Sequence, residues 1–125
     1  MSRKVLLVDD SGLARRSTRR ILEGAGYEVV EAEDGMAAIE QYFVEKPDLV
    51  MLDLVMKGMY GLDVLGKLRE MDPDACVLVL SADIQTSSRE MVQAAGGAGF
   101  LSKPAKPQDM LDMLARAVER GDAWS

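Results

Sequence analysis

Apolar residues fall along this chain in short runs that alternate with longer amphipathic segments. Most of the runs lack the alternating polar residues of a half-exposed strand, which is typical of strands buried on both faces of a parallel sheet. They predict strands at residues 5–8, 27–32, 49–53, 76–80 and 100–102. Helical spacing and turn residues predict helices at residues 13–23, between Asp34 and Pro47, at residues 62–70, between Thr86 and Gly96, and between Pro107 and Gly121.

Five strands that alternate with five helices predict an α/β fold with helices on both faces of the sheet. Right-handed crossovers favour a doubly wound, flavodoxin-like parallel sheet with its strands in the order 2-1-3-4-5. The apolar spacing in the second predicted helix places Met36, Ala38, Ile39 and Phe43 on its buried side.

The strand at residues 49–53 delivers one carboxylate, Asp53, to the end of a nearly unbroken apolar run. Burial of a lone charge inside a strand has a large desolvation cost, so we expect Asp53 at the carboxyl edge of the strand. Ligands of open α/β sheets bind at that edge.

Residues with complementary chemistry end the other strands. Asp9 and Asp10 follow the first strand, Ser81 the fourth and Lys103 the fifth. Each alone is more often a capping or loop residue. Together they form a site in which three carboxylates favour a hard divalent ion, Mg²⁺ before Ca²⁺ or Mn²⁺, and in which Lys103 and Ser81 can bind phosphoryl oxygens. Asp53 is then the nucleophile that forms an aspartyl phosphate.

Length and composition limit the function further. The 125 residues fit one domain, and a net charge of −6 argues against direct DNA binding. No apolar run approaches the roughly 20 residues of a membrane span, so we expect a cytoplasmic protein without a membrane partner. The chain has no histidine, which excludes imidazole bases and histidine-activated nucleophiles.

Four short motifs in this chain resemble those of a known protein family. Residues 5–10, Asp53 followed by Met56 and Gly61, Ser81-Ala82, and residues 97–104 resemble the response-regulator receiver domains of two-component signalling, with a CheY-like single-domain architecture. The resemblance covers residues 1–121 as the receiver domain and leaves residues 122–125 as a short tail.

This resemblance implies a role for each site residue. Asp53 resembles the phosphoacceptor, Asp10 the direct Mg²⁺ ligand, and Asp9 an acidic neighbour that acts through water. The backbone carbonyl of Val55 corresponds to a further metal ligand, and Lys103 to the lysine that pairs with the phosphoryl group.

The resemblance also implies a switch. Ser81 corresponds to its hydroxyl, Phe100 to its aromatic residue, and Ala82 leaves space for their motion. Lys103-Pro104 is a candidate cis bond. Phosphorylation would change the surface of the fourth helix, fifth strand and fifth helix, although Phe100 as a plain core residue stays an open alternative.

The resemblance also implies which partners the chain has. A sensor histidine kinase or a histidine phosphotransfer protein would supply the phosphohistidine that this chain lacks, and a protein target, chemotactic or other, would receive the signal. The arginines of the first helix are either a solvated face or a docking site for an acidic partner helix. They are Arg15, Arg16, Arg19 and Arg20.

Three residues depart from the family pattern. Lys57 stands where proline is common, Tyr60 where Asp or Asn often precedes the glycine, and Val55 where polar side chains influence hydrolysis. The lifetime of the phosphoryl group is therefore open.

Two alternative functions fit the sequence less well. A phosphatase that turns over an aspartyl phosphate usually has an acid two residues after the nucleophile, where this chain has Val55. A flavodoxin needs a phosphate-binding loop after the first strand, where Asp9 and Asp10 would repel the flavin phosphate.

Overall fold

Five parallel strands form a single sheet in the computed structural model, which describes residues 3–56, 58–82 and 86–124. The strands are β1 (Lys4–Val8), β2 (Glu28–Ala32), β3 (Leu49–Asp53), β4 (Val77–Ser81) and β5 (Gly99–Ser102). Their order, β2-β1-β3-β4-β5, confirms the predicted fold. The predicted strand bounds are right to within one residue, because turn residues and charges flank each apolar run.

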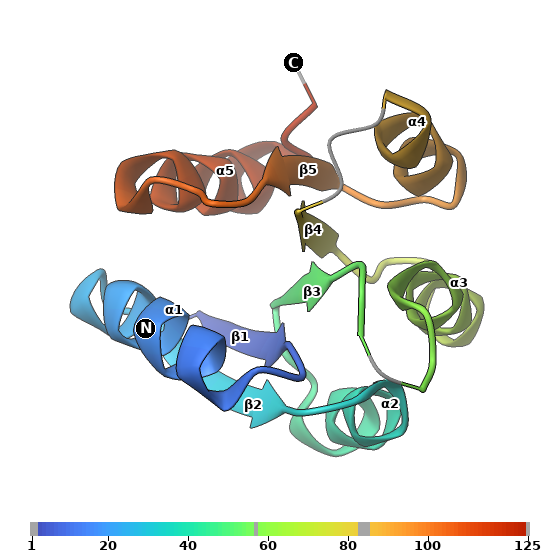
Figure 1. Cartoon of the computed structure of the whole chain (residues 1–125), viewed down its shortest axis with the longest axis horizontal. Helices are drawn as coiled ribbons and strands as arrows, with labels where there is room; N and C mark the ends of the chain where they lie inside the picture. The colour runs from blue at the N-terminus through green and yellow to red at the C-terminus, as the bar shows by residue number, and fades with distance from the viewer. Residues whose placement is uncertain (1–2, 57, 83–85, 125) are drawn as a thin grey trace.

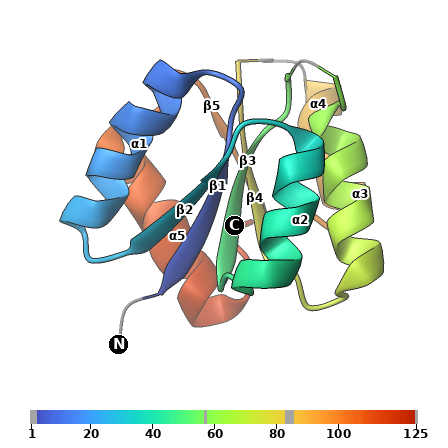
Figure 2. The same cartoon turned by 90° about the horizontal axis from the view of Figure 1, so that it is seen from below.

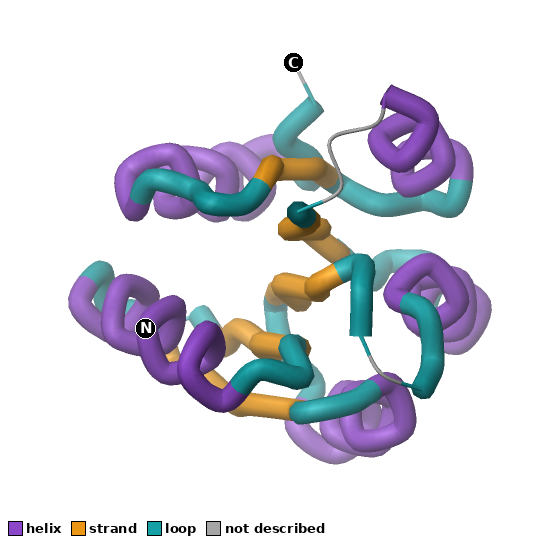
Figure 3. The backbone as a smooth tube through the Cα atoms, viewed as in Figure 1, coloured by secondary structure: helices purple, strands orange, loops and turns teal. Residues whose placement is uncertain are grey.

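Five helices cover the two faces of this sheet. They are α1 (Gly12–Gly24), α2 (Gly35–Glu45), α3 (Gly61–Met71), α4 (Thr86–Ala94) and α5 (Pro107–Arg120). Helices α1 and α5 lie on one face, and α2, α3 and α4 lie on the other (Figures 1 and 3). In the described part of the chain, none of these helices has the length and apolar character that crossing a bilayer requires.

Strand β3 is buried on both sides, as its unbroken apolar run predicts. Leu49 and Met51 belong to the core under α1 and α5, whereas Val50 and Leu52 belong to the core under α2, α3 and α4. This alternation follows from the two-residue period of a strand. It fixes the register of β3 and therefore the position of Asp53 at its end.

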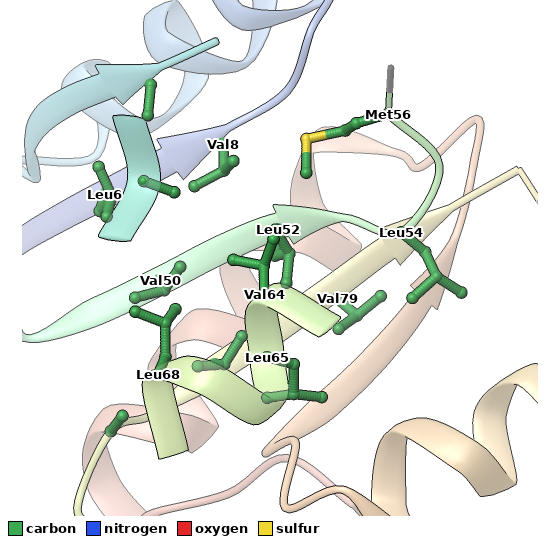
Figure 4. Packing of buried hydrophobic residues seen from close by; sticks show 14 of the residues in the cluster. Leu6, Val8, Val50, Leu52, Leu54, Met56, Val64, Leu65, Leu68 and Val79 are labelled. Carbon is green, nitrogen blue, oxygen red and sulfur yellow. The ribbon is translucent and has the colours of Figure 1, made fainter. Parts of the chain in front are cut away.

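The larger core lies between the sheet and helices α2, α3 and α4. Figure 4 shows Val64, Leu65 and Leu68 of α3 against Val50 and Leu52 of β3, and all five side chains are fully buried. Burial of a leucine or valine side chain contributes about 1.5–3 kcal/mol, so this contact fixes α3 on the sheet.

The predicted buried side of α2 is wrong at two positions. Met36 is 63% exposed and Phe43 is 71% exposed, whereas Gly35 and Ala38 face the core. A Cβ atom on Gly35 would lie 2.8 Å from Val64 Cγ2, so α2 approaches α3 too closely for large side chains. Apolar residues surround this helix, and the stripe of smallest residues is the one that is buried.

The start of α3 lies directly against the end of β3. A Cβ atom on Gly61 would be 2.6 Å from both the Asp53 carbonyl oxygen and Leu54 Cα. The Gly61 N–H donates to the Leu54 carbonyl oxygen at 2.9 Å. Because backbone atoms make this close contact, a side chain here would displace the segment that carries Asp53.

We therefore predict opposite effects of alanine at two glycines of α3. Gly61→Ala forces backbone apart and lowers the free energy of unfolding by about 1–3 kcal/mol. Gly66→Ala is the matched control, because its Cβ meets nothing within 4 Å. This control raises the free energy of unfolding by about 0.5–1 kcal/mol through helix propensity. Urea denaturation measures both, and equal effects would contradict the close approach at Gly61.

Candidate functional site

The residues that end the parallel strands meet at one edge of the sheet. Asp9 follows β1, Asp53 ends β3, Ser81 ends β4 and Lys103 follows β5. The loops that follow β1 and β3 lie at the same end of the molecule (Figure 2). The pairing of Val8 with Leu52 brings the ends of β1 and β3 level.

Lys103 joins two of the predicted carboxylates. Its Nζ lies 2.9 Å from Asp9 Oδ2 and 3.2 Å from Asp53 Oδ2. The two side chains are only 8% and 13% exposed, so water screens these ion pairs less than pairs on the open surface. The Lys103 N–H also donates to the Ser81 carbonyl oxygen at 2.8 Å, and the Lys103-Pro104 bond is cis, as the resemblance predicted.

Asp9, Asp10 and Asp53 form an acidic triad. One carboxylate oxygen from each residue lies within 4.8 Å of the others. Among the described residues, three carboxylates against the one ammonium of Lys103 leave an excess of two negative charges. A divalent cation balances this charge, and the all-oxygen donor set suits Mg²⁺. The triad thus has the chemistry typical of the magnesium site of receiver domains.

At both Asp53 and Lys103, burial and neighbouring charges shift the pKa in opposite directions. Burial raises the pKa of Asp53 above its ordinary value, although the positive charge of Lys103 and the hydrogen bond from the Val55 N–H oppose this shift. Burial alone would lower the pKa of Lys103, but Asp9 and Asp53 outweigh it and raise that pKa. Lys103 is therefore a cation at neutral pH, and its charge helps to keep Asp53 ionised.

Backbone groups orient the acidic side chains. The Val55 N–H donates to Asp53 Oδ1 at 3.2 Å, and the Ser11 N–H donates to Asp9 Oδ1 at 2.9 Å. Each carboxylate thus has one oxygen bound to backbone and the other bound to Lys103. Such bonds hold the charged groups in place before any ligand binds.

Arg15 is a supporting residue that the sequence did not single out for this role. Its Nη1 donates to the Asp9 carbonyl oxygen at 2.6 Å, and its Nε donates to Glu31 Oε1 at 3.0 Å. The guanidinium therefore ties the loop after β1 to strand β2. Its place one turn after the Ser11 cap is a sequence signal for such a contact, but an arginine on a helix face has many other possible partners.

The predicted switch residues lie in β4 and β5 or directly after them. Ser81 is fully buried and Ala82 is exposed. Phe100 is partly buried and packs against the core under α2, α3 and α4. Ser81 thus ends the strand beside β3, and Phe100 lies one strand further out, on the edge strand β5.

The loop after β3 contains the departures from the family pattern. Val55 is 57% exposed, so its apolar side chain borders the site on the solvent side. Tyr60 occupies the N-cap position of α3 and makes no side-chain capping bond there. Lys57, the third departure, lies outside the described residues.

A cleft of about 390 Å³ extends from the acidic edge between α1 and the segment that leads into α5. Ile21 and Met110 line its walls and Met51 its floor, while Asp53 and Lys103 border its polar end. The sequence did not predict this cleft, because it depends on the spacing of two helices that are far apart in the chain.

Comparisons with known proteins agree with this geometry. The model of the response regulator receiver domain family matches residues 5–115. The chemotaxis protein CheY of Thermotoga maritima is 36% identical over 115 residues, which cover 91% of this chain and 96% of that protein.

Two solved structures are also similar. Chemotaxis protein CheY4 of Vibrio cholerae has a TM-score of 0.88 at 30% identity, and the alignment covers 93% of this chain and 98% of that one. CheY in the CheX-CheY-BeF₃-Mg²⁺ complex of Borrelia burgdorferi has a TM-score of 0.87 at 28% identity, with 93% and 88% covered. Because the family match runs from the first strand into the last helix, this chain belongs to the family of response regulator receiver domains.

Proposed function

We propose that this chain is a response-regulator receiver that accepts a phosphoryl group on Asp53 from a partner phosphohistidine. The observation that carries the proposal is the contact of Lys103 with both Asp9 and Asp53 inside an acidic triad. Phosphoryl transfer depends mainly on positioning and charge stabilisation, and this edge of the sheet provides both. The chain is cytoplasmic in this proposal and acts on a partner protein instead of a small substrate.

The transfer is a nucleophilic displacement at phosphorus. An oxygen of the Asp53 carboxylate attacks the phosphorus and forms a P–O bond, while the P–N bond to the partner imidazole breaks and its electron pair returns to the nitrogen. The Lys103 ammonium then leaves the Asp53 oxygen and pairs with a phosphoryl oxygen. The Ser81 hydroxyl donates a hydrogen bond to that phosphoryl oxygen as well. The product is an aspartyl phosphate.

Mg²⁺ fits the triad that precedes this step. Asp10, Asp53 and the Val55 carbonyl would hold the ion directly, and Asp9 through water. When bound, the ion neutralises the negative charge that gathers on the phosphoryl oxygens. Asp9 also holds Lys103, so it positions the cation that the incoming group requires.

The switch follows from the position of Ser81 and Phe100. When the Ser81 hydroxyl turns toward the phosphoryl group, Phe100 moves into the space that it leaves, and the exposed Ala82 does not obstruct this motion. The surface formed by α4, β5 and α5 then changes its affinity for a partner protein. A coupling of about 1–3 kcal/mol is typical of such links between two sites.

The exposed residues of α1 favour a protein phosphodonor. Arg15 and Arg19 are held by Glu31, which leaves Arg16 and Arg20 on the exposed side of the helix. Leu13 is 75% exposed at the end of α1 beside the site. An acidic kinase or phosphotransfer helix with an apolar contact residue matches this surface. The CheY relatives suggest a chemotaxis pathway for the partners.

The first prediction concerns the acceptor residue. Incubation with phosphoramidate and Mg²⁺ labels the chain to about one phosphoryl group per molecule, because Asp53 is the only nucleophile in the proposal. Asp53→Asn abolishes the label, and Asp48→Asn, directly before β3, is the control that keeps it. Phosphate-affinity gel electrophoresis measures the fraction labelled.

The same incubation tests the phosphatase alternative. Sustained release of many phosphates per chain, with little labelled protein, would favour an enzyme that turns over an aspartyl phosphate. A label that persists in Asp53→Asn would instead contradict the choice of acceptor.

The second prediction separates the two roles of Lys103. Lys103→Ala removes the cation that contacts the triad in the described part of the chain, so the affinity for Mg²⁺ rises roughly tenfold. The rate of phosphorylation nevertheless falls by about 10²–10³, because a charge that stabilises the phosphoryl oxygens is lost. Calorimetry measures the first effect and labelling kinetics the second.

Lys106→Ala is the control for this variant, because Lys106 is an exposed cation three residues further along the chain. It should change neither quantity by more than about twofold. A parallel loss of metal affinity and phosphorylation in Lys103→Ala would contradict the proposed division of roles.

A further inference from the structure

The segment after α5 turns back onto the edge of the sheet. Gly121 ends the helix in the left-handed region at a φ of 87°, and its N–H donates to the Ala117 carbonyl oxygen. Residues 122–124, here called the edge segment, then lie beside β5 between α5 and α4 (Figure 1). Only glycine adopts this backbone conformation without strain, so Gly121 directs the edge segment toward β5.

Three contacts hold the edge segment. The Ala123 N–H donates to the Ala98 carbonyl oxygen at 2.7 Å, and Trp124 Nε1 donates to the Gly97 carbonyl oxygen at 2.9 Å. The guanidinium of Arg89, on α4, lies 5.4 Å from the centre of the Trp124 ring. Each of these contacts stabilises the edge segment in its place against the sheet.

The edge segment also packs against both cores of the protein. Ala123 contacts the core under α1 and α5, whereas Trp124 contacts the core under α2, α3 and α4. A Cβ atom on Gly99, at the start of β5, would lie 3.3 Å from the Ala123 Cβ atom. The segment therefore crosses the start of β5, an edge strand that pairs with β4 in the described sheet.

Edge strands present unpaired backbone groups to other chains unless something covers them. In this protein the edge segment contacts α4 and β5, and these are two of the elements that bind a partner protein in the proposed function. Tryptophan provides a large apolar surface and one N–H donor, which is the combination typical of residues that anchor protein contacts.

We propose that the edge segment masks the α4–β5 surface, and that modification of Asp53 releases it. The inference rests on the proposed function and adds a regulatory contact to it. A target protein that docks on this surface must supply an aromatic side chain that stacks on Arg89 and takes the place of Trp124. The contacts described above are those of the unmodified state, in which the Lys103 ammonium is hydrogen-bonded to the Asp53 carboxylate.

A shared core links the two sites. Phe100 and Trp124 both pack against the core under α2, α3 and α4, so in this proposal the movement of Phe100 reaches Trp124 through that core. Binding free energies are reciprocal: if modification of Asp53 weakens the edge segment, loss of the edge segment must favour modification. This reciprocity makes the proposal testable without the target protein.

The experiment measures beryllofluoride binding with Mg²⁺, followed by the fluorine NMR signal of the bound anion. Trp124→Ala should bind beryllofluoride about fivefold more tightly than the wild-type chain, at the low end of typical allosteric couplings. Phe43→Ala is the matched control, because it removes an exposed aromatic ring from α2, on the other side of the molecule. This control should leave the affinity unchanged.

A second readout needs no substitution. Trp124 is the only tryptophan in the chain, so its fluorescence reports on the edge segment alone. We expect acrylamide to quench it more strongly after beryllofluoride binds. Trp124→Phe keeps a ring over Arg89 but loses the bond to the Gly97 carbonyl oxygen, so its affinity should fall between those of the wild type and Trp124→Ala.

The outcomes separate this inference from the proposed function. Bound beryllofluoride with unchanged quenching, or an affinity in Trp124→Ala that is equal to or weaker than in the wild type, would overturn the masking proposal and leave the phosphoacceptor role intact. If the wild-type chain binds no beryllofluoride in the presence of Mg²⁺, the phosphoacceptor role fails and the masking proposal fails with it.

Discussion

Charge balance at one edge of the sheet is the constraint on which the site depends. Lys103 lies 94 residues from Asp9 and 50 residues from Asp53 along the chain, yet its ammonium contacts both carboxylates. Only the parallel arrangement of β1, β3 and β5 brings these strand ends together. Three carboxylates in partial burial would repel one another without a cation, and one lysine neutralises only part of their charge. The remaining negative charge is what suits the site to a divalent metal.

The packing of the fold keeps this charged edge in place. Strand β3 has a different core on each of its faces, so it cannot shift by one residue without exposing apolar side chains. The close approach of Gly61 and the bonds of Arg15 then fix the loops on either side of Asp53. Burial of apolar side chains away from the site therefore determines where the acidic oxygens lie.

The sequence predicted the strand order and the residues at the acidic edge, because both follow from local patterns. An apolar run ends where a charge begins, and parallel strands end at a common edge. The buried side of α2 could not be predicted, since apolar residues surround that helix and the choice depends on how closely it approaches α3. The contacts of Trp124 with Gly97 and Arg89 depend on the path of the chain after Gly121, and no local pattern encodes that path.

The central claim is that Asp53 receives the phosphoryl group while the other carboxylates hold the metal and Lys103. The most direct test is borohydride reduction of the phosphorylated chain, followed by peptide mass spectrometry. Reduction of an acyl phosphate converts an aspartate to homoserine, which marks the acceptor without any substitution. The account predicts homoserine at position 53 alone. Homoserine at position 9 or 10, or a stable phosphate on Ser81 with residue 53 unchanged, would contradict it.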